Sequence, residues 1–375
     1  MPLVHSQEEL SAWLRLSLEP GIGPATAGEL LREIGPPPTL YGLSRQALAE
    51  RLPAPLAGQL RDPPSAPMRE AVERALEWVQ APGRHVLTLG DGAYPQALRD
   101  LHDPPPVLYV CGDPAWLSRP AIAVVGARNA TPDGLASAHA FARHLARQGW
   151  CIVSGMALGI DAAAHRGALE AGAAGGGTIA VVGTGADVVY PARHRRLAQE
   201  IEAMGAIVSE FPLGTPALAH QFPRRNRLVA GLARGTLVAE AALRSGSLIT
   251  ARLAAETGRE VFAIPGSIHS PLARGCHALI RQGATLVESA EDILDELHGA
   301  RRLFGRSGEE PGSAPVPADG LLAAMGYGPI HLDALAARSG LAVPVLQARL
   351  LALELQGRVA RLDGGRYQVC RAHNA

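Results

Sequence analysis

Lysine is absent from this sequence, and all 35 of its basic residues are arginine. This absence excludes a Schiff-base lysine and the lysine of a P-loop. The arginines are balanced by 35 acidic residues, so the chain is not basic as a whole, although this count does not describe local patches. Any anion that the protein holds must therefore be bound by arginine, backbone N–H groups and hydroxyls.

Cysteines are few and far apart: Cys111, Cys151, Cys276 and Cys370 form no C-x-x-C pair. Neither a zinc site nor a disulfide framework is therefore predicted, and a reducing compartment fits this pattern. The sequence also lacks an apolar run of the roughly 20 residues that span a bilayer. Residues 1–10 lack the basic and apolar segments of a signal peptide. We expect a cytoplasmic protein with no membrane partner.

Familiar catalytic motifs are missing as well. The sequence contains no G-x-S-x-G and no H-E-x-x-H, and its 13 histidines are scattered. Donors suited to anion binding are abundant, whereas a nucleophile with its base does not emerge. We predict a binding protein with no catalytic residues, no metal and no cofactor.

The chain divides into four regions by composition, and its length predicts two or three domains. Residues 1–80 indicate short helices broken by Pro and Gly. Residues 85–300 alternate apolar runs with Ala-rich helical ones, and residues 320–370 predict three helices and a hairpin. Residues 301–319 are rich in Gly, Pro and Ser, which predicts a linker.

The middle region carries the predicted architecture. Most of its apolar runs are continuous rather than alternating, which is typical of parallel strands buried on both faces. The runs lie at 121–126, 151–155, 178–183, 206–210, 236–240, 261–266 and 284–288. Helical stretches such as 134–149 and 247–259 separate them, so we predict a doubly wound, mostly parallel α/β sheet.

Ligands bind such sheets at the carboxyl ends of the strands, so the residues that follow each strand are the candidates for a site. After the first run, Gly126 opens a loop in which Arg128 is placed to bind a phosphate. The alternative is an Arg128 that pairs with a carboxylate to close the end of the sheet.

The second loop contains Ser154 and Gly155, followed by Asp161 and His165. Asp161 is expected to be the N-cap of the next helix. His165 lies four residues further on, so the two side chains are expected on one helix face, either as a structural hydrogen-bonded pair or as an acid–base pair.

The third loop contains the G-x-G of Gly183 and Gly185, without the third small residue of a dinucleotide fingerprint, which argues against NAD. Arginines follow a proline there, with Arg193 and Arg195 as the candidates for a polyanion site. The alternative is a solvated helix face.

The fourth loop, 210–235, is predicted to be long, flexible and functional because it is rich in Pro and Gly. It offers an aromatic residue and polar or basic neighbours for a single strand of nucleic acid. These candidates are Phe222, Arg224, Arg225, Asn226 and Arg227. Phe222 is equally suited to anchor the loop in the core.

The fifth loop places Ser245, Gly246 and Ser247 at the start of a helix. Backbone and hydroxyl donors at a helix start form a second candidate site for phosphate. Ser245 or Ser247 is also a plausible N-cap, and one residue can serve both purposes.

These motifs together resemble the DprA/Smf family of DNA-processing proteins over residues 85–298. The matching segments are VVGARNATPDG, SGMALGIDAAAH, YP, SEFPLG, FPRRNRLVAGL, EAALRSGSLITA, GREVFAIPG and GCHALIRQGA. The resemblance implies a Rossmann-like domain, a homodimer and binding of single-stranded DNA. It also implies that the protein loads RecA recombinase during natural transformation and helps displace single-strand-binding protein, without catalytic turnover.

The resemblance also implies that Arg128 and basic residues after the YP motif form the DNA pocket. Two positions depart from the family's pattern: Ala127 stands where a Ser is usual, and Ala192 where a Lys is common. We therefore expect a retained pocket with an altered set of donors, in which Arg193 or Arg195 takes the place of the Lys. The segment HALIRQGATLV is a candidate dimer surface.

The two regions that flank residues 85–300 contain motifs that indicate function less specifically than those of the middle region. Residues 11–35 resemble a helix-hairpin-helix element, which corresponds in the family to a sterile-α-motif-like domain. This element either contacts phosphates or packs as a plain helical unit. Residues 330–357 and the hairpin after them predict a winged helix. Its second helix sets Arg349 against Glu354, so we favour protein contact or packing over sequence-specific reading of DNA.

Two other functions are alternatives to single-stranded DNA binding. A nucleotide-phosphoribohydrolase shares a Rossmann-like fold but needs a P-G-G-x-G-T-x-x-E run, which this sequence lacks. A transcription regulator would act through residues 320–370, and the weakly basic second helix argues against it.

Overall fold

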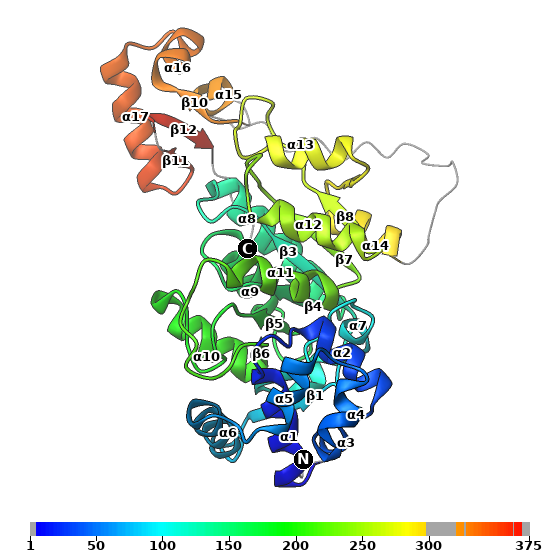
Figure 1. Ribbon diagram of the computed structural model, residues 1–375. Coiled ribbons are helices and arrows are strands. Elements are labelled where there is room, and N and C mark those ends of the chain that lie inside the picture. Colours follow the sequence, from blue (N-terminus) through cyan, green and yellow to red (C-terminus); the bar gives the residue numbers. More distant parts are fainter. Residues whose placement is uncertain (1–4, 298–319, 326–327, 363, 370–375) are drawn as a thin grey trace.

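The computed structural model describes residues 5–297, 320–325, 328–362 and 364–369. The predicted linker at 301–319 lies outside these residues. Six short helices form the N-terminal region, blue in Figure 1. They are α1 (Gln7–Leu18), α2 (Pro24–Glu33), α3 (Pro37–Gly42), α4 (Arg45–Ala49), α5 (Ala54–Arg61) and α6 (Ala66–Trp78).

The start of α1 shows how local sequence sets these helices. The Ser6 hydroxyl accepts from the Glu9 N–H at 3.2 Å, and the Glu9 carboxylate accepts from the Ser6 N–H at 2.8 Å. This capping box satisfies two backbone donors of the first turn. The predicted glycine turn joins α1 to α2, with Gly21 at a φ of 76° that side chains rarely adopt.

A nine-stranded sheet organises the middle of the chain, in the order β1-β2-β6-β5-β4-β3-β7-β8-β9. The strands are β1 (Arg84–Thr88), β2 (Val107–Gly112), β3 (Ala121–Val125), β4 (Cys151–Ser154), β5 (Thr178–Val181), β6 (Gly205–Ser209), β7 (Gly235–Val238), β8 (Glu260–Ala263) and β9 (Thr285–Leu286). The pairs β1–β2 and β2–β6 are antiparallel, and the remaining neighbours are parallel. The predicted mostly parallel α/β sheet is confirmed.

The two ends of the sheet differ from the prediction. β1 and β2 are not among the predicted strands, because they add to the parallel sheet as an antiparallel pair outside the strand–helix alternation. The predicted run 284–288 is a strand only over 285–286. β9 forms an edge of the sheet and is only partly buried, so it lacks the pairing that extends a central strand.

Helices cover both faces of the sheet, as Figure 1 shows. One face packs against α7 (Gln96–Arg99), α11 (Gln221–Leu232), α12 (Ser247–Glu256) and α13 (Arg274–Arg281). The other packs against α8 (Pro132–Arg147), α9 (Ile160–Leu169) and α14 (Ala290–Leu297), and α10 (Arg195–Met204) lies beside β6. Ala123 and Val125 of β3 enter the first core, whereas Ile122 and Val124 enter the second. This alternation explains why β3 is an unbroken apolar run.

The topology fixes where a ligand site forms. From β3 the chain builds the sheet outward to β6 and then returns to place β7 on the other side of β3. The connections that leave β3 and β7 therefore run in opposite directions and leave a crevice at the carboxyl ends of these two strands.

The C-terminal elements form a separate small unit, orange to red in Figure 1. They are α15 (Gly320–Met325), β10 (Ile330–His331), α16 (Leu332–Ser339), α17 (Val343–Leu355), β11 (Val359–Leu362) and β12 (Arg366–Val369). The three strands pair in the order β10-β12-β11. Helices α16 and α17 followed by the β11–β12 hairpin confirm the predicted winged helix. Gln368 of β12 donates a hydrogen bond to Asp133 of α8.

Candidate nucleic-acid interface

A pocket of about 670 Å³ lies at the crevice between the ends of β3 and β7. Loops and helix starts from five places in the sequence line it. Of the residues predicted from sequence, it brings together Gly126, Arg128, Phe222, Arg225, Asn226, Ser245, Gly246 and Ser247. Half of the predicted set thus converges on one concave site at the position that the topology favours.

The other predicted residues are not part of this lining: Ser154, Gly155, Gly183, Gly185, Arg193, Arg195, Arg224 and Arg227. Several of them serve the protein's own packing. The Ser154 hydroxyl donates to the Val124 carbonyl at 2.7 Å. A Cβ on Gly183 would lie 3.1 Å from the Phe222 ring, and one on Gly185 would lie 2.7 Å from the Pro212 carbonyl.

Arg225 forms the inner wall of the pocket. It extends from α11 and is only 5 % exposed. Its guanidinium fills the space where Gly155 has no side chain, since a Cβ there would lie 1.4 Å from Nη1. Within the part of the chain that the structure describes, no hydrogen bond or ion pair reaches this guanidinium, and its buried Nε has no partner. Burial lowers the pKa of Arg225, while the charge of Asp161 opposes this.

Asp161 lies in the first turn of α9 and is not its N-cap, which corrects the prediction. Gly159 caps the helix instead, with a φ of 75° that a side chain would strain. The Asp161 carboxylate reaches back and accepts from the backbone N–H groups of Gly155 at 3.1 Å and Ala157 at 3.2 Å. Burial raises the pKa of Asp161, and the charge of Arg225 and these donors work against the rise. Asp161 therefore shapes the loop after β4 and lines the pocket.

His165 does not pair with Asp161 in the structure. Its Nδ1 lies 2.7 Å from the Thr178 hydroxyl, which itself donates to the Ile152 carbonyl at 2.7 Å. The Thr178 oxygen must therefore accept from an Nδ1–H, which makes His165 the neutral Nδ1 tautomer. Burial lowers the pKa of His165 to about 3. Of the two alternatives for this histidine, neither the Asp161 pair nor an acid–base role is found, because β5 supplies its partner.

Two aromatic rings meet at the pocket. The Tyr190 and Phe222 ring centroids lie 5.8 Å apart at an angle of 41°, and the Arg128 Cζ lies 5.6 Å from the Phe222 centroid. Tyr190 is 49 % exposed, so its ring is open to a ligand. Tyr190 belongs to the YP motif but was not among the candidate site residues predicted from the sequence. An exposed aromatic residue close to an arginine cluster is the signal that would have identified it.

The segment predicted as a flexible loop contains α11 over Gln221–Leu232, so this prediction was wrong. Its apolar residues Leu228, Val229 and Leu232 pack into the core, and this burial outweighs the irregular start of the segment. Arg227 points away from the pocket, into an ion pair with the buried Glu210 and a second one with Asp103 at 3.3 Å. Arg224 is half exposed and lies 3.5 Å from the same Glu210.

Arg193 and Arg195 lie in the short helical turn Ala192–His194 and at the start of α10, where both are exposed. Among the residues that the structure describes, neither has an ion-pair partner, whereas the neighbouring Arg196 lies 2.9 Å from Glu200. Both follow closely in sequence after Tyr190, which lines the pocket. They remain candidates for contact with a polyanion that leaves the pocket.

The first turn of α12 supplies the opposite wall. Gly246 is its N-cap, so neither Ser245 nor Ser247 has the predicted capping position. The Ser245 hydroxyl instead accepts from the Ser247 N–H at 3.3 Å and lies 2.7 Å from the Ser247 hydroxyl. Ser247 and Thr250 both line the pocket and are almost fully buried. Helix dipole and hydroxyl donors thus face the same space as Arg225.

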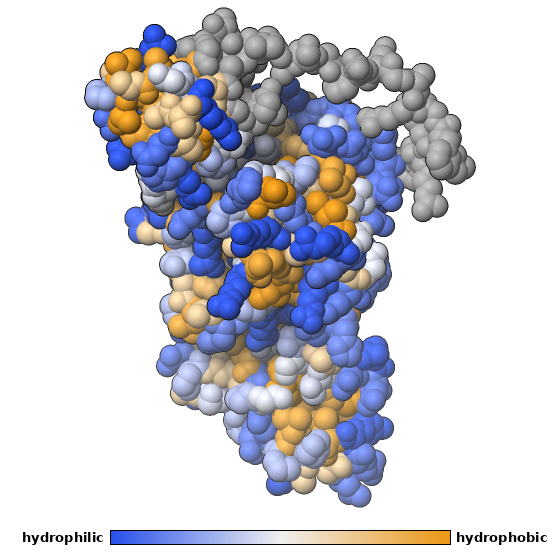
Figure 2. Space-filling model, turned by 90° about the horizontal axis from the view of Figure 1, so that it is seen from above, coloured by the Kyte–Doolittle hydropathy of each residue, from blue (hydrophilic) through white to orange (hydrophobic). Residues whose placement is uncertain are grey.

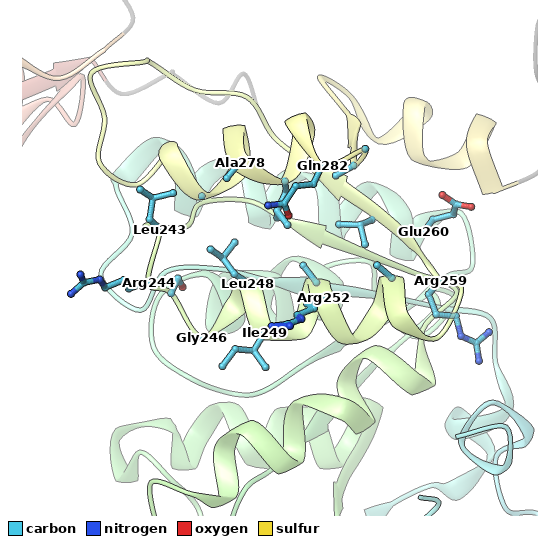
Figure 3. Close-up of a pocket in the computed structure, with 18 of the residues that line it drawn as sticks. Leu243, Arg244, Gly246, Leu248, Ile249, Arg252, Arg259, Glu260, Ala278 and Gln282 are labelled. Carbon is cyan, nitrogen blue, oxygen red and sulfur yellow. The ribbon is translucent and has the colours of Figure 1, made fainter. Parts of the chain in front are cut away.

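A larger hollow of about 980 Å³ lies between α12 and α13 and adjoins the pocket, since Ser245, Gly246 and Ile249 line both. Figure 3 shows Leu248 and Ile249 on the α12 side of this hollow and Ala278 and Gln282 on the α13 side. Within the described residues, no group of three or more His, Cys, Asp or Glu is placed to hold a metal. The helices described here include none that is long and apolar enough to cross a membrane.

Comparisons with known proteins find relatives in sequence. Residues 85–298 match the family model of DNA recombination-mediator protein A, and residues 309–365 match that of the DprA winged helix domain. The chain is 42 % identical to Protein Smf of Escherichia coli over 311 residues, covering 81 % of this chain and 82 % of that protein. It is 48 % identical to DNA processing protein DprA of Streptococcus pneumoniae over 206 residues, covering 55 % of this chain and 72 % of that protein.

Two solved structures are similar as well. The crystal structure of DprA from Streptococcus pneumoniae superposes with a TM-score of 0.65 at 36 % identity, over 78 % of this chain and 98 % of that one. A structure of DNA processing protein A from Helicobacter pylori, reported for its single-stranded DNA binding mode, superposes with a TM-score of 0.52 at 32 % identity. It covers 58 % of this chain and 97 % of that one.

Proposed function

Because the chain belongs to the DprA/Smf family of DNA-processing proteins, we propose that it binds single-stranded DNA in the pocket between β3 and β7. We further propose that it passes this strand to RecA recombinase during natural transformation and helps displace single-strand-binding protein. In this proposal the protein acts in the cytoplasm by binding alone, with no chemical step.

The observation that carries the proposal is the convergence of cations, aromatic rings and a helix start on one pocket. Arg128 is exposed at its mouth, Phe222 and Tyr190 offer faces for stacking, and α12 directs its N-terminus inward. Stacking rings beside basic groups suit single strands, whose bases are unpaired, better than duplexes. The free Arg193 and Arg195 extend the basic surface beyond the pocket.

Homodimer formation belongs to the same proposal. The hollow between α12 and α13 exposes Leu243 and Ile249 (Figure 3). It adjoins the pocket between β3 and β7 through shared lining residues. The segment HALIRQGATLV contributes the second half of α13, including Ala278 and Leu279, to the lining of this hollow. A partner bound there, whether a second copy or RecA, would lie next to a strand held in the pocket.

DNA binding is tested by fluorescence anisotropy of the full chain with a labelled oligonucleotide, single-stranded and as a duplex. We expect tighter binding of the single strand and an affinity that falls as salt rises, because bound arginines release counterions. Arg128→Ala should weaken binding about tenfold or more, since a hydrogen bond to a charged group contributes about 1.5–3 kcal/mol. Arg143→Gln, on α8 and paired with Glu170 at 3.8 Å, lines neither the pocket nor the hollow beside it and is the matched control. Equal affinity of Arg128→Ala and the parent would refute the site.

Hand-off to RecA is tested by RecA filament formation on DNA coated with single-strand-binding protein. We expect this protein to speed it and Arg128→Ala to lose most of the effect. Release of free base from a nucleoside monophosphate would instead favour the nucleotide-phosphoribohydrolase alternative.

A further inference from the structure

The innermost cation of the pocket has no acceptor in the protein. Arg225 is 95 % buried, yet its guanidinium lacks the hydrogen-bonded carboxylate that buried arginines normally have, as far as the described residues show. Asp161 contributes charge from beyond ion-pair distance and already accepts two backbone N–H groups. A buried guanidinium without a carboxylate partner is stabilised when an anion from outside the protein binds to it.

The protein is built to keep this cation in place. Gly155 leaves room for the guanidinium, and any larger residue would collide with Nη1. The loop that contains Gly155 is in turn held by the Asp161 carboxylate through the Gly155 and Ala157 N–H groups. The position of Arg225 is therefore fixed by two other residues and is not an accident of side-chain packing.

A second and independent set of donors faces the same space. The first turn of α12, a helix of ten residues, lines the pocket with Ser247 and Thr250, which are 8 % and 2 % exposed. Helix N-termini carry partial positive charge and free N–H groups, which suit tetrahedral oxyanions. A guanidinium adds paired N–H donors that match phosphate oxygens.

We propose that the inner end of this pocket, between Arg225 and the first turn of α12, is a separate anion subsite that binds a phosphate group. This subsite lies beneath the exposed Arg128 and is distinct from the basic surface of Arg193 and Arg195. The proposal deepens the proposed function and rests on it only for the source of the phosphate, since the subsite itself would bind a free phosphate ion. Phe222 and Tyr190 nearby make a phosphate with a base attached the best-fitting ligand.

The phosphate can come from two sources, a DNA strand or a free small molecule such as a nucleoside monophosphate. Both have the same oxyanion, and a strand offers it either as a terminal monoester or as an internal diester. The full chain is therefore first titrated with inorganic phosphate, with ionic strength held constant by chloride, and its melting temperature is recorded. We expect a saturable rise, because a ligand that binds only the folded state stabilises it.

Variants locate the subsite. Arg225→Gln should weaken inorganic phosphate binding about tenfold or more, because it removes a charge-assisted contact. Thr250→Val keeps the shape of α12 and removes one donor, so it should weaken binding by a smaller factor if Arg225→Gln does not fold. Arg143→Gln removes the same charge from α8, outside the lining of the pocket, and should bind phosphate like the parent chain. No saturable rise in the parent, or an equal rise in both pocket variants, would overturn the subsite.

Competition assigns the source. Displacement of a labelled oligonucleotide by inorganic phosphate, with tighter binding of a 5′-phosphorylated strand than of its 5′-hydroxyl form, supports a strand terminus. Displacement with equal binding of both forms supports an internal diester, and saturable phosphate binding without displacement supports a small molecule. If the parent chain binds phosphate but not single-stranded DNA, the proposed function is refuted and the phosphate subsite is retained. If the parent chain binds single-stranded DNA but not phosphate, the subsite is refuted and the proposed function is retained.

Discussion

Arg225 and Arg227 lie two residues apart on α11, and both are buried, yet they face different surroundings. Arg227 points toward β6, where Glu210 and Asp103 neutralise it. Arg225 points toward the pocket, where no carboxylate is within ion-pair distance among the described residues. Two positions along a helix correspond to a rotation of about 200°, so two arginines at this spacing can have opposite roles.

This difference shows what a run of arginines can and cannot indicate. The segment FPRRNR gives a composition suited to nucleic acid, but one of its cations is used for the fold and another faces the ligand. Burial alone does not separate the two. The presence or absence of a carboxylate partner does, and this partner comes from β6, far from α11 in sequence.

The strongest test of this comparison removes the partner of Arg227. Glu210→Ala should lower the free energy of unfolding by about 3 kcal/mol, because it leaves the buried Arg227 guanidinium with only the more exposed Asp103 as an ion-pair partner. Urea denaturation followed by circular dichroism measures the loss. Glu200→Ala breaks the exposed Arg196–Glu200 pair and should cost less than about 1 kcal/mol. Similar losses in the two variants would show that Arg227 is no more dependent on its partner than a surface arginine.

His165 sharpens the comparison, because it is a buried basic group that can give up its proton. Its pKa in the folded chain is about 3, against an ordinary value of 6.5. Between these values the unfolded chain takes up a proton and the folded chain does not, so stability falls as pH falls. From pH 7 to pH 5 this group should cost about 2 kcal/mol.

The measurement is the urea midpoint of the parent chain and of His165→Gln at both pH values. The variant should lose about 2 kcal/mol less than the parent over this interval. Parallel pH dependences in the two proteins would show that His165 is protonated in the folded state. Arginine has no such escape, which is why Arg225 needs an anion whereas His165 needs none.

The sequence predicted the sheet and the edge that carries the site, because buried parallel strands and their loops leave a strong local pattern. Arg128 and the start of α12 were predicted because ligands bind such sheets at the carboxyl ends of the strands. The sequence could not show that Asp161 supports the loop after β4, that His165 pairs with Thr178, or that Arg227 is neutralised. Each depends on a contact between segments that only the folded sheet brings together. Residues 210–235 were wrongly predicted to be a loop, because their Pro and Gly content outweighed the helical pattern of the apolar residues in α11.

Arg193 and Arg195 test the other side of the comparison, the cations that are free and exposed. Replacing both with Ala should weaken single-stranded DNA binding a few-fold. It should also reduce the slope of log affinity against log salt by about 1 for each lost phosphate contact. Stability should hardly change, because neither side chain is buried. If the slope of log affinity against log salt does not change, the bound single-stranded DNA does not contact the start of α10.

Helix α17 should give the smallest effect, although its domain has a fold that often reads DNA. Leu346, Leu350 and Leu353 pack into the core of the winged helix, and the opposite side exposes Leu351 and Leu355, the latter 82 % exposed. Figure 2, with this domain at upper left, shows hydrophobic residues on its surface. A helix that enters the major groove needs cations at these positions rather than leucines.

Leu351→Ser together with Leu355→Ser should therefore change the affinity for single-stranded DNA and for duplex DNA less than twofold, within the error of the anisotropy assay. Exposed apolar residues of this kind are typical of protein contacts, so the same variant is the one to examine in RecA filament assays. A marked loss of duplex binding would assign the winged helix a direct role on DNA. The chain would then have two DNA-binding surfaces, the arginine-lined pocket between β3 and β7 and the apolar side of α17.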